Sequence, residues 1–157
     1  MQAQYYYNDI LTIKKSNDEY QKLKKAQYRT VTLESFEFDD SPSQGFFCER
    51  KLNNDFSESV MISRSDVTGE SELRSYYKDG RVYKTVNTNG DVINTAGFEY
   101  NTVGQLQKVT SSTVGVADSS RFEEVREYEY DADGVLTALR RFKNGVQVSM
   151  IKFEKDE

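Results

Sequence analysis

The sequence predicts a mostly β protein: an antiparallel meander of consecutive hairpins in a curved sheet, with one N-terminal helix packed on it. Two observations predict this fold class. From residue 29 onward, short runs alternate apolar and polar residues as strands do, and Asn-Gly or Asp-Gly pairs separate some of them as hairpin turns do. A helical period occurs only in the first quarter of the chain. We expect a single β-rich domain over residues 1–157, with a helical segment at 1–28 and the hairpin array at 29–157.

The stretch SNDEYQKLKKAQ (16–27) is the predicted helix. Ser16 followed three residues later by Glu19 is a capping box, in which each side chain binds a free amide of the first turn. One narrow apolar stripe follows, made of Tyr20, Leu23 and Ala26. We expect this stripe to pack against the sheet and the lysines of KLKK (22–25) to lie on a solvated face. Upstream, YYYNDILTI (5–13) fits either an extension of this helix or a separate strand, and the helix is favoured.

The first predicted strand is RTVTLESFEF (29–38). Val31 and Leu33 share one face, whereas the two later phenylalanines have the opposite parity. One extra residue at positions 34–35 would return all four side chains to one face, so we expect a β-bulge there. Pro42 lies in a cluster of turn-forming residues, and further short strand-like runs follow it.

Three dipeptides predict two-residue hairpin turns. They are Asp79-Gly80, Asn89-Gly90 and Asn144-Gly145, and each lies between two strand-like runs. Residues of these types tolerate the positive φ angles that such turns require, and the twist of the turn then matches that of the strands.

Two longer stretches, FEYNTVGQLQKV (98–109) and YEYDADGVLTAL (128–139), repeat one pattern. In each, two aromatic residues on one strand face precede an Asn or Asp that can bind the turn backbone, then a Gly and a Leu. These residues are Phe98, Tyr100, Asn101, Gly104 and Leu106 in the first copy, and Tyr128, Tyr130, Asp131, Gly134 and Leu136 in the second. We interpret both as hairpin corners, with glycine in the left-handed conformation, aromatic side chains that pack across strands, and the leucine restarting the apolar face.

The second corner, YDADGVL (130–136), resembles the Tyr-Asp repeat of Rhs-type and related bacterial cell-surface proteins, and 98–106 matches it with Asn101 in place of the Asp. The likeness covers residues 76–157 and is nearest to the short hairpin arrays of secreted or outer-surface proteins of the Bacteroides group. It implies export to the periplasm, the outer surface or the medium, and a binding or structural role. It carries over no catalytic residues.

The two ends of the sequence add to this expectation. QAQ, directly after Met1, is similar to the residues found around a signal-peptidase site, which also favours export. FEKDE (153–157) resembles the start of a further repeat and stops before a glycine. We therefore expect the array to be truncated here, so that its last strand is a sheet edge that normally has a partner.

Composition limits the chemistry. Only 36% of the 157 residues are hydrophobic and the net charge is −5, with acids and bases interspersed. A nucleic-acid partner is not expected, since phosphate binding needs clustered basic residues. No apolar run has the length of a membrane-spanning segment.

The absence of histidine excludes Ser-His-Asp triads, Cys-His pairs and histidine-liganded metals. Cys48 shares its strand parity with Phe46 and Leu52, which predicts a small buried side chain rather than a reactive thiol.

Two stretches have features of chemical sites, but a simpler interpretation is available for each. DADG (131–134) has the alternating aspartates of a calcium loop, but no third oxygen ligand or distal glutamate follows at the required spacing. RFEEVREYEY (121–130) has paired carboxylates like a glycosidase, yet glutamates on a solvated strand face are far commoner, and we favour that interpretation. We predict no catalytic residue, no cofactor and no metal.

The leading interpretation is therefore a non-catalytic, exported binding or scaffold module. It would bind a protein, a second copy of itself or a glycan through its strand edges and one aromatic sheet face. Tyr100, Tyr128 and Tyr130 are the candidate binding residues on that face, unless the helix or a second sheet covers them. The alternative is a carrier, in which a curved sheet and the helix enclose an apolar ligand.

Overall fold

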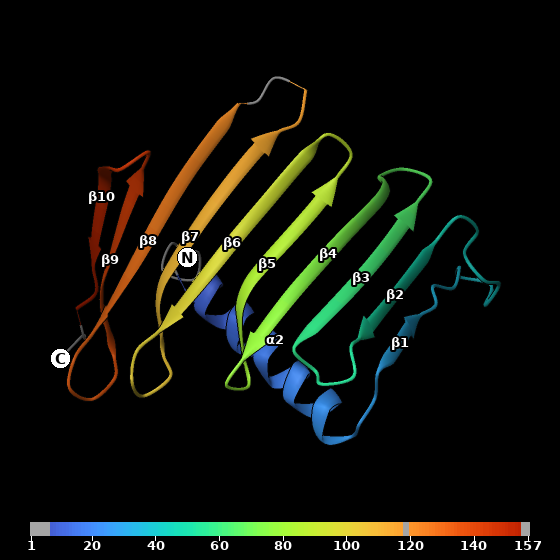
Figure 1. Ribbon diagram of the computed structural model, residues 1–157, viewed down its shortest axis with the longest axis horizontal. Coiled ribbons are helices and arrows are strands. Elements are labelled where there is room, and N and C mark those ends of the chain that lie inside the picture. The colour runs from blue at the N-terminus through green and yellow to red at the C-terminus, as the bar shows by residue number, and fades with distance from the viewer. Residues whose placement is uncertain (1–6, 118–119, 155–157) are drawn as a thin grey trace.

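The computed structural model describes residues 7–117 and 120–154. These residues form one helix, α2 (Asn8–Lys25), and ten strands that pair in chain order into one antiparallel sheet (Figure 1). The strands are β1 (Thr30–Leu33), β2 (Phe47–Leu52), β3 (Glu58–Ser65), β4 (Gly69–Lys78), β5 (Arg81–Asn89), β6 (Val92–Tyr100), β7 (Leu106–Gly115), β8 (Arg121–Tyr130), β9 (Leu136–Lys143) and β10 (Val146–Lys152). The sheet is not closed, because β1 and β10 are its two edges. The predicted fold class, a hairpin meander with one N-terminal helix, is confirmed.

Helix α2 crosses the strands on one face of the sheet, near one of its ends (Figure 1). This end carries the β2–β3, β4–β5, β6–β7 and β8–β9 connections, and we call it the covered half. The opposite end carries the β3–β4, β5–β6 and β7–β8 turns, and we call it the bare half. The face that α2 packs on is the helix face.

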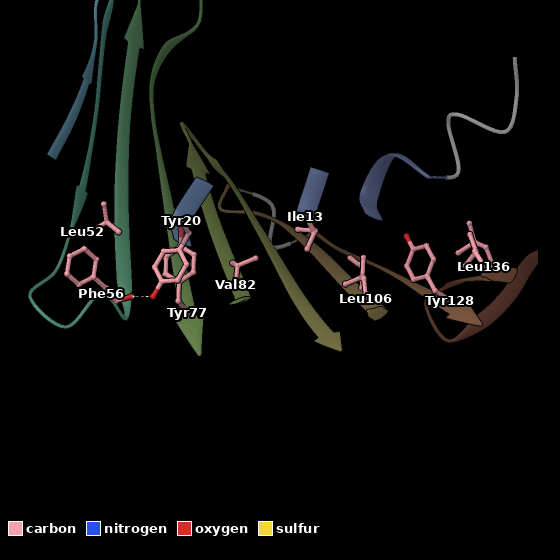
Figure 2. Close-up of a cluster of buried hydrophobic side chains, with 11 residues drawn as sticks. Ile13, Tyr20, Leu52, Phe56, Tyr77, Val82, Leu106, Tyr128 and Leu136 are labelled. Atoms are coloured by element: carbon pink, nitrogen blue, oxygen red, sulfur yellow. Dashed lines mark hydrogen bonds between the residues drawn. The ribbon is translucent and has the colours of Figure 1, made fainter. Parts of the chain in front are cut away.

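The hydrophobic core lies between α2 and the covered half (Figure 2). The Tyr20 ring stacks on Tyr77, with centroids 3.8 Å apart and planes 4° from parallel, and its hydroxyl donates to the Phe56 carbonyl at 2.7 Å. The other core residues are Ile13, Leu52, Val82, Leu106, Val109, Tyr128, Leu136 and Leu139. Each large apolar side chain buried here contributes about 1.5–3 kcal/mol, so this thin layer accounts for most of the hydrophobic stabilisation.

The helix begins earlier than the predicted capping box. Ser16 and Glu19 lie inside α2, which begins at Asn8, and Glu19 pairs instead with Arg50 at 3.2 Å. The favoured helical extension upstream is confirmed from Asn8 onward, whereas residues 5 and 6 lie outside the described part of the chain. The helix extends upstream because Ile13, two turns before Tyr20, continues the apolar stripe that packs on the sheet.

The predicted bulge at positions 34–35 is wrong. Strand β1 ends at Leu33, and the following segment forms a small turn closed by a bridge between Phe36 and Pro42. Phe36 and Phe38 are exposed, because α2 does not cover this edge and no common apolar face forms. Cys48 on β2, by contrast, is buried as predicted.

Two of the three predicted two-residue turns are confirmed. Asp79-Gly80 joins β4 to β5 and Asn144-Gly145 joins β9 to β10, and all four residues have positive φ. The third turn is shifted by one residue. Asn89 still pairs with Val92 at the end of the ladder, so the turn consists of the two residues at positions 90–91.

Both predicted corners have the expected geometry. In the β6–β7 corner, Asn101 Oδ1 accepts the amides of Val103 and Gln105 at 3.2 and 2.9 Å, and Gly104 has φ +87°. In the β8–β9 corner, Asp131 Oδ1 accepts the amides of residues 133 and 135 at 3.0 and 2.8 Å. The side-chain oxygen therefore replaces missing ladder bonds in both corners.

A third corner of this kind, between β2 and β3, escaped sequence reasoning. Asn53 Oδ1 accepts the Glu58 amide at 3.1 Å, and Phe56, with φ 59°, stands where the other two corners have glycine. A left-handed phenylalanine is strained. Here its ring is 4% exposed in the core and its carbonyl accepts the Tyr20 hydroxyl, and these contacts offset the strain.

Candidate functional site

The three candidate tyrosines all lie on the helix face, but α2 treats them differently. Tyr128 is 3% exposed and its hydroxyl donates to Asp9 in the first turn of α2. Tyr100 and Tyr130 are half-buried and line one groove beside the helix. The period-two pattern thus places the three residues on one face, and the helix then leaves two of them accessible.

Tyr100 and Tyr130 also join successive hairpins. The Tyr100 hydroxyl donates to the Val82 carbonyl and the Tyr130 hydroxyl to the Leu106 carbonyl, both at 2.7 Å. Each tyrosine follows a register shift at the end of its strand and bonds to the start of the preceding strand, which is its neighbour in the sheet. The rings of the repeated motif therefore hold the corners at a fixed spacing.

The groove lies between the first half of α2 and the corners β6–β7 and β8–β9. It has a volume of about 560 Å³ and is half open to solvent. Its apolar wall consists of Tyr7, Ile10, Ile13, Tyr100, Leu106, Tyr130, Val135 and Leu136. Its polar lining consists of Lys14, Asn17, Asp18, Arg81 and Gln105. Because these residues come from α2 and from strand ends far apart in sequence, no local sequence pattern predicts the groove.

Two of the polar groups in the groove are committed to the fold. Asn17 accepts the Val82 amide at 2.9 Å and donates to the Tyr100 hydroxyl at 3.3 Å, which ties α2 to the start of β5. Gln105 donates to the Gly134 carbonyl at 2.8 Å and so joins the two corners. These amides shape the groove rather than offering free hydrogen-bonding groups.

The charged groups in the groove are different. Lys14, Asp18 and Arg81 take part in none of the ion pairs formed among the described residues. The Arg81 guanidinium lies over the Tyr100 ring, 5.5 Å from its centroid. This cation–π contact orients the side chain but does not neutralise its charge.

Burial keeps the tyrosine hydroxyls protonated. It raises the pKa of Tyr100 above its usual range, and it raises the pKa of Tyr130 to about 12, with a further contribution from Tyr7. Both phenols therefore act as hydrogen-bond donors near neutral pH. They fix backbone carbonyls, and neither is poised as a general base.

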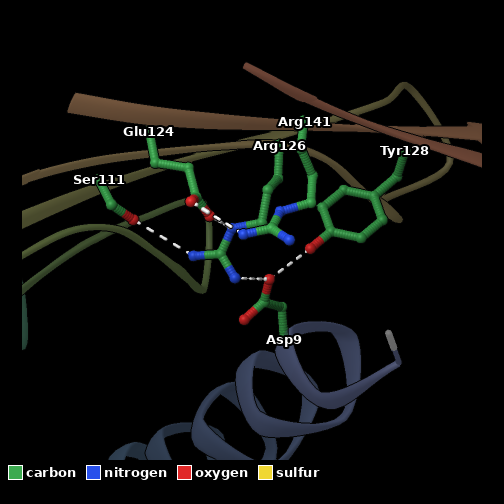
Figure 3. A network of polar contacts seen from close by, with 6 residues as sticks. All are labelled: Asp9, Ser111, Glu124, Arg126, Tyr128 and Arg141. Atoms are coloured by element: carbon green, nitrogen blue, oxygen red, sulfur yellow. Dashed lines mark hydrogen bonds and ion pairs between the residues drawn. The ribbon is translucent and has the colours of Figure 1, made fainter. Parts of the chain in front are cut away.

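A network of charges fastens the first turn of α2 to β8 (Figure 3). Arg126 pairs with Asp9 of the helix and with Glu124 at 3.3 Å, and Glu124 also pairs with Arg141 at 3.0 Å. Burial, followed by the hydrogen bond to Asp9, raises the pKa of Tyr128 well above its usual range. Because each carboxylate already has a cationic partner, we assign this network a positioning role.

The carboxylate pattern of β8 divides between the two faces of the sheet. Glu124 lies on the helix face with Arg126, whereas Glu123, Glu127 and Glu129 alternate onto the other face. Among the described residues, no group of three or more His, Cys, Asp or Glu side chains could hold a metal ion. In the stretch considered as a calcium loop, Asp131 Oδ1 accepts two backbone amides.

The free edge of the sheet at β10 is the second candidate surface. Val146, Val148 and Met150 are 66%, 49% and 42% exposed, and Lys152 is the one charged residue of this strand. Edge strands usually carry several charges or are very short, which prevents association. Strand β1, the other edge, has four residues, whereas β10 has seven.

Comparison with protein-family models, curated proteins and solved structures finds no match for this chain. None of the helical segments in the described residues has the length and apolar character needed to cross a membrane. The function must therefore be argued from the two surfaces themselves, the groove and the β10 edge.

Proposed function

We propose that this chain is a non-catalytic binding or scaffold module that associates through the exposed edge of β10, and that its first partner is a second copy of the same strand. The observation that carries the proposal is a seven-residue strand with three exposed apolar side chains, which forms one edge of the sheet built by the described residues. Such an edge offers unpaired amides and carbonyls to another strand.

Charge distribution supports pairing between two copies. If two β10 strands pair antiparallel about a two-fold axis at Ser149, Met150 faces Val148 and Lys152 faces Val146 of the other copy. Neither contact places like charges opposite each other, which would be destabilising. The two sheets would then form one sheet of twenty strands, and the α2 helix of each copy would pack on its own ten strands.

The resemblance to the Tyr-Asp repeat supports placing this module in a bacterial envelope or outside the cell. In that setting, an open array of hairpins would serve as a spacer or an adhesive surface. The proposed location is periplasmic, outer-surface or secreted, and the partner is a protein rather than nucleic acid.

The experiment is light scattering across a dilution series of the 18.1 kDa chain. We expect the mass to rise towards twice that value with concentration, and the double variant Val148→Lys, Met150→Lys to remain at the mass of one chain. The matched control is Val67→Lys, Val103→Lys, in which both valines lie in exposed turns away from the edge. It should associate like the wild type. One-chain mass at every wild-type concentration, or unchanged association of the edge variant, contradicts the proposal.

A second candidate function is a carrier, and the groove beside α2 favours it. At about 560 Å³, the groove falls within the roughly 300–1,000 Å³ typical of small-molecule sites. It differs from the expected enclosed pocket because it is half open and has charged residues in its lining. The chemistry of those charges decides which ligand it would accept.

A further inference from the structure

We infer that the groove between α2 and the two hairpin corners binds a small amphipathic monocarboxylate, with its carboxylate on Arg81 and its apolar part between α2 and the Tyr100 and Tyr130 rings. This inference concerns the groove of the carrier alternative and is independent of the β10 edge. It rests on one juxtaposition: an arginine that has no carboxylate partner in the described part of the chain lies beside an apolar wall.

The arginines of this chain show how unusual Arg81 is. Seven of the nine form ion pairs with Asp or Glu: Arg50, Arg64, Arg74, Arg121, Arg126, Arg140 and Arg141. Arg29 donates instead to the Asn54 carbonyl. Among residues 7–117 and 120–154, Arg81 forms no ion pair and lies over the Tyr100 ring, so its planar set of N–H donors can bind an anion.

The fold fixes the position of the Arg81 guanidinium. Arg81 directly follows the Asp79-Gly80 turn, and its side chain extends along the groove to the β6–β7 corner. A Cβ atom placed on Gly104 would lie 2.3 Å from Arg81 Nη2, so the space that the guanidinium occupies exists because residue 104 has no side chain. The positive φ of the corner favours glycine, and a side chain at this position would displace the guanidinium from the place where it lies.

The charges of the lining fit a single negative charge. Lys14 and Arg81 contribute two positive charges and Asp18 one negative charge, which leaves a net +1. A monoanion would neutralise this charge, whereas Asp18 disfavours a dianion. A carboxylate can accept two parallel N–H bonds from a guanidinium, which gives it a geometric advantage over a neutral polar group.

The wall accounts for the apolar part of the ligand. Ile10 and Ile13 of α2 face Tyr100, Leu106 and the β8–β9 corner across the groove. The tyrosine hydroxyls already bond backbone carbonyls, so the rings present mainly their apolar surfaces. A linear or cyclic hydrocarbon part of the ligand would therefore make apolar contacts with this wall and meet few polar groups.

The test uses hexanoate and hexan-1-ol as probes and follows the backbone amides of Gly104 and Gly134 by NMR titration at neutral pH. We expect hexanoate to shift both amides and to bind about tenfold more tightly than hexan-1-ol, because a hydrogen bond between two charged groups is stronger than one to a neutral hydroxyl. Arg81→Gln should remove this preference. The matched control Arg121→Gln changes a distant and exposed arginine, and should keep it.

A second variant tests the location independently. Val135→Trp fills the groove from a side chain that is 37% exposed, so the fold should tolerate it, and binding of both probes should be lost. Equal affinity of wild type for the acid and the alcohol, or unchanged affinity in Arg81→Gln, overturns the inference. The β10 variant Val148→Lys, Met150→Lys should bind hexanoate normally, so failure of the edge proposal and failure of this one are distinguishable.

Discussion

Along β6 and β7, the two ends of the same strands have different surroundings. At one end, Leu106 is buried and Tyr100 half-buried under α2, and at the other, Val92 and Asn94 are exposed. The strands stay paired through both ends, with one register shift between Glu99 and Tyr100. A long antiparallel sheet thus needs a hydrophobic layer on only part of its length, provided that its register is fixed elsewhere.

The bare half relies on cross-strand polar pairs instead. On the helix face, Thr113 donates to Asn94 at 2.7 Å, and the hydroxyls of Ser63 and Ser71 lie 2.8 Å apart. On the other face, Arg64 pairs with Glu70 beside the β3–β4 turn. Each such pair contributes about 0.2–1 kcal/mol, less than one buried aromatic ring. We therefore expect stability to be concentrated in the covered half, with the turns setting register in the bare half.

The difference between the covered and bare halves predicts that the largest loss of stability follows from a change at Tyr20. Tyr20→Ala removes a ring that is 1% exposed and stacked on Tyr77, so we expect unfolding free energy to fall by about 3–5 kcal/mol. The matched variant is Tyr83→Ala, since Tyr83 is 45% exposed on β5, and it should cost no more than about 1 kcal/mol. Chemical denaturation measures both. Similar losses would show that stability is spread evenly along the strands.

A smaller effect is expected where α2 is fastened to β8. Asp9→Asn keeps the shape of the side chain but removes the charge that Arg126 and Tyr128 contact. Loss of hydrogen bonds to a charged group should lower unfolding free energy by about 2 kcal/mol, and high salt should reduce the difference. Asp133→Asn, in the exposed β8–β9 corner, is the control and should stay within about 0.5 kcal/mol of wild type. An unchanged Asp9→Asn variant would mean that core packing alone holds the helix.

The sequence predicts those parts of the fold that local chemistry determines. Asp79-Gly80 and the paired corners at 101–105 and 131–135 carry their own turn geometry, so the meander follows from them. The β2–β3 corner was missed because Phe56 replaces the glycine, and only its burial under Tyr20 explains that choice.

The candidate site depends on contacts that sequence spacing cannot show. Alternation placed Tyr100, Tyr128 and Tyr130 on one face, but the position of α2 decides which of them remain accessible. Arg81 was not singled out, since a lone arginine after a hairpin turn is ordinary. Its significance comes from the missing carboxylate partner and from Gly104, both of which are tertiary features.

The smallest predicted effect tests whether the tyrosines of the repeated corners stabilise the covered half. Tyr130→Phe removes the hydroxyl that donates to Leu106, which should cost about 1 kcal/mol at neutral pH. The groove residue Val135 is adjacent to the same corner, so Val135→Ala is a suitable control. Its side chain is 37% exposed, and this variant should show no comparable dependence on pH.

The pH dependence of Tyr130→Phe distinguishes a hydrogen bond from simple packing. Folding raises the pKa of Tyr130 from its usual 10.0 to about 12, mainly by burial. The folded state holds this proton more tightly, so the stabilisation is complete below pH 10 and is lost as pH rises from 10 to about 12. Wild type should therefore lose stability over this range faster than Tyr130→Phe, and their difference should shrink. Denaturation midpoints measured alongside near-ultraviolet tyrosinate absorbance test this, and equal stability of wild type and Tyr130→Phe below pH 10 would assign the role of Tyr130 to its ring alone.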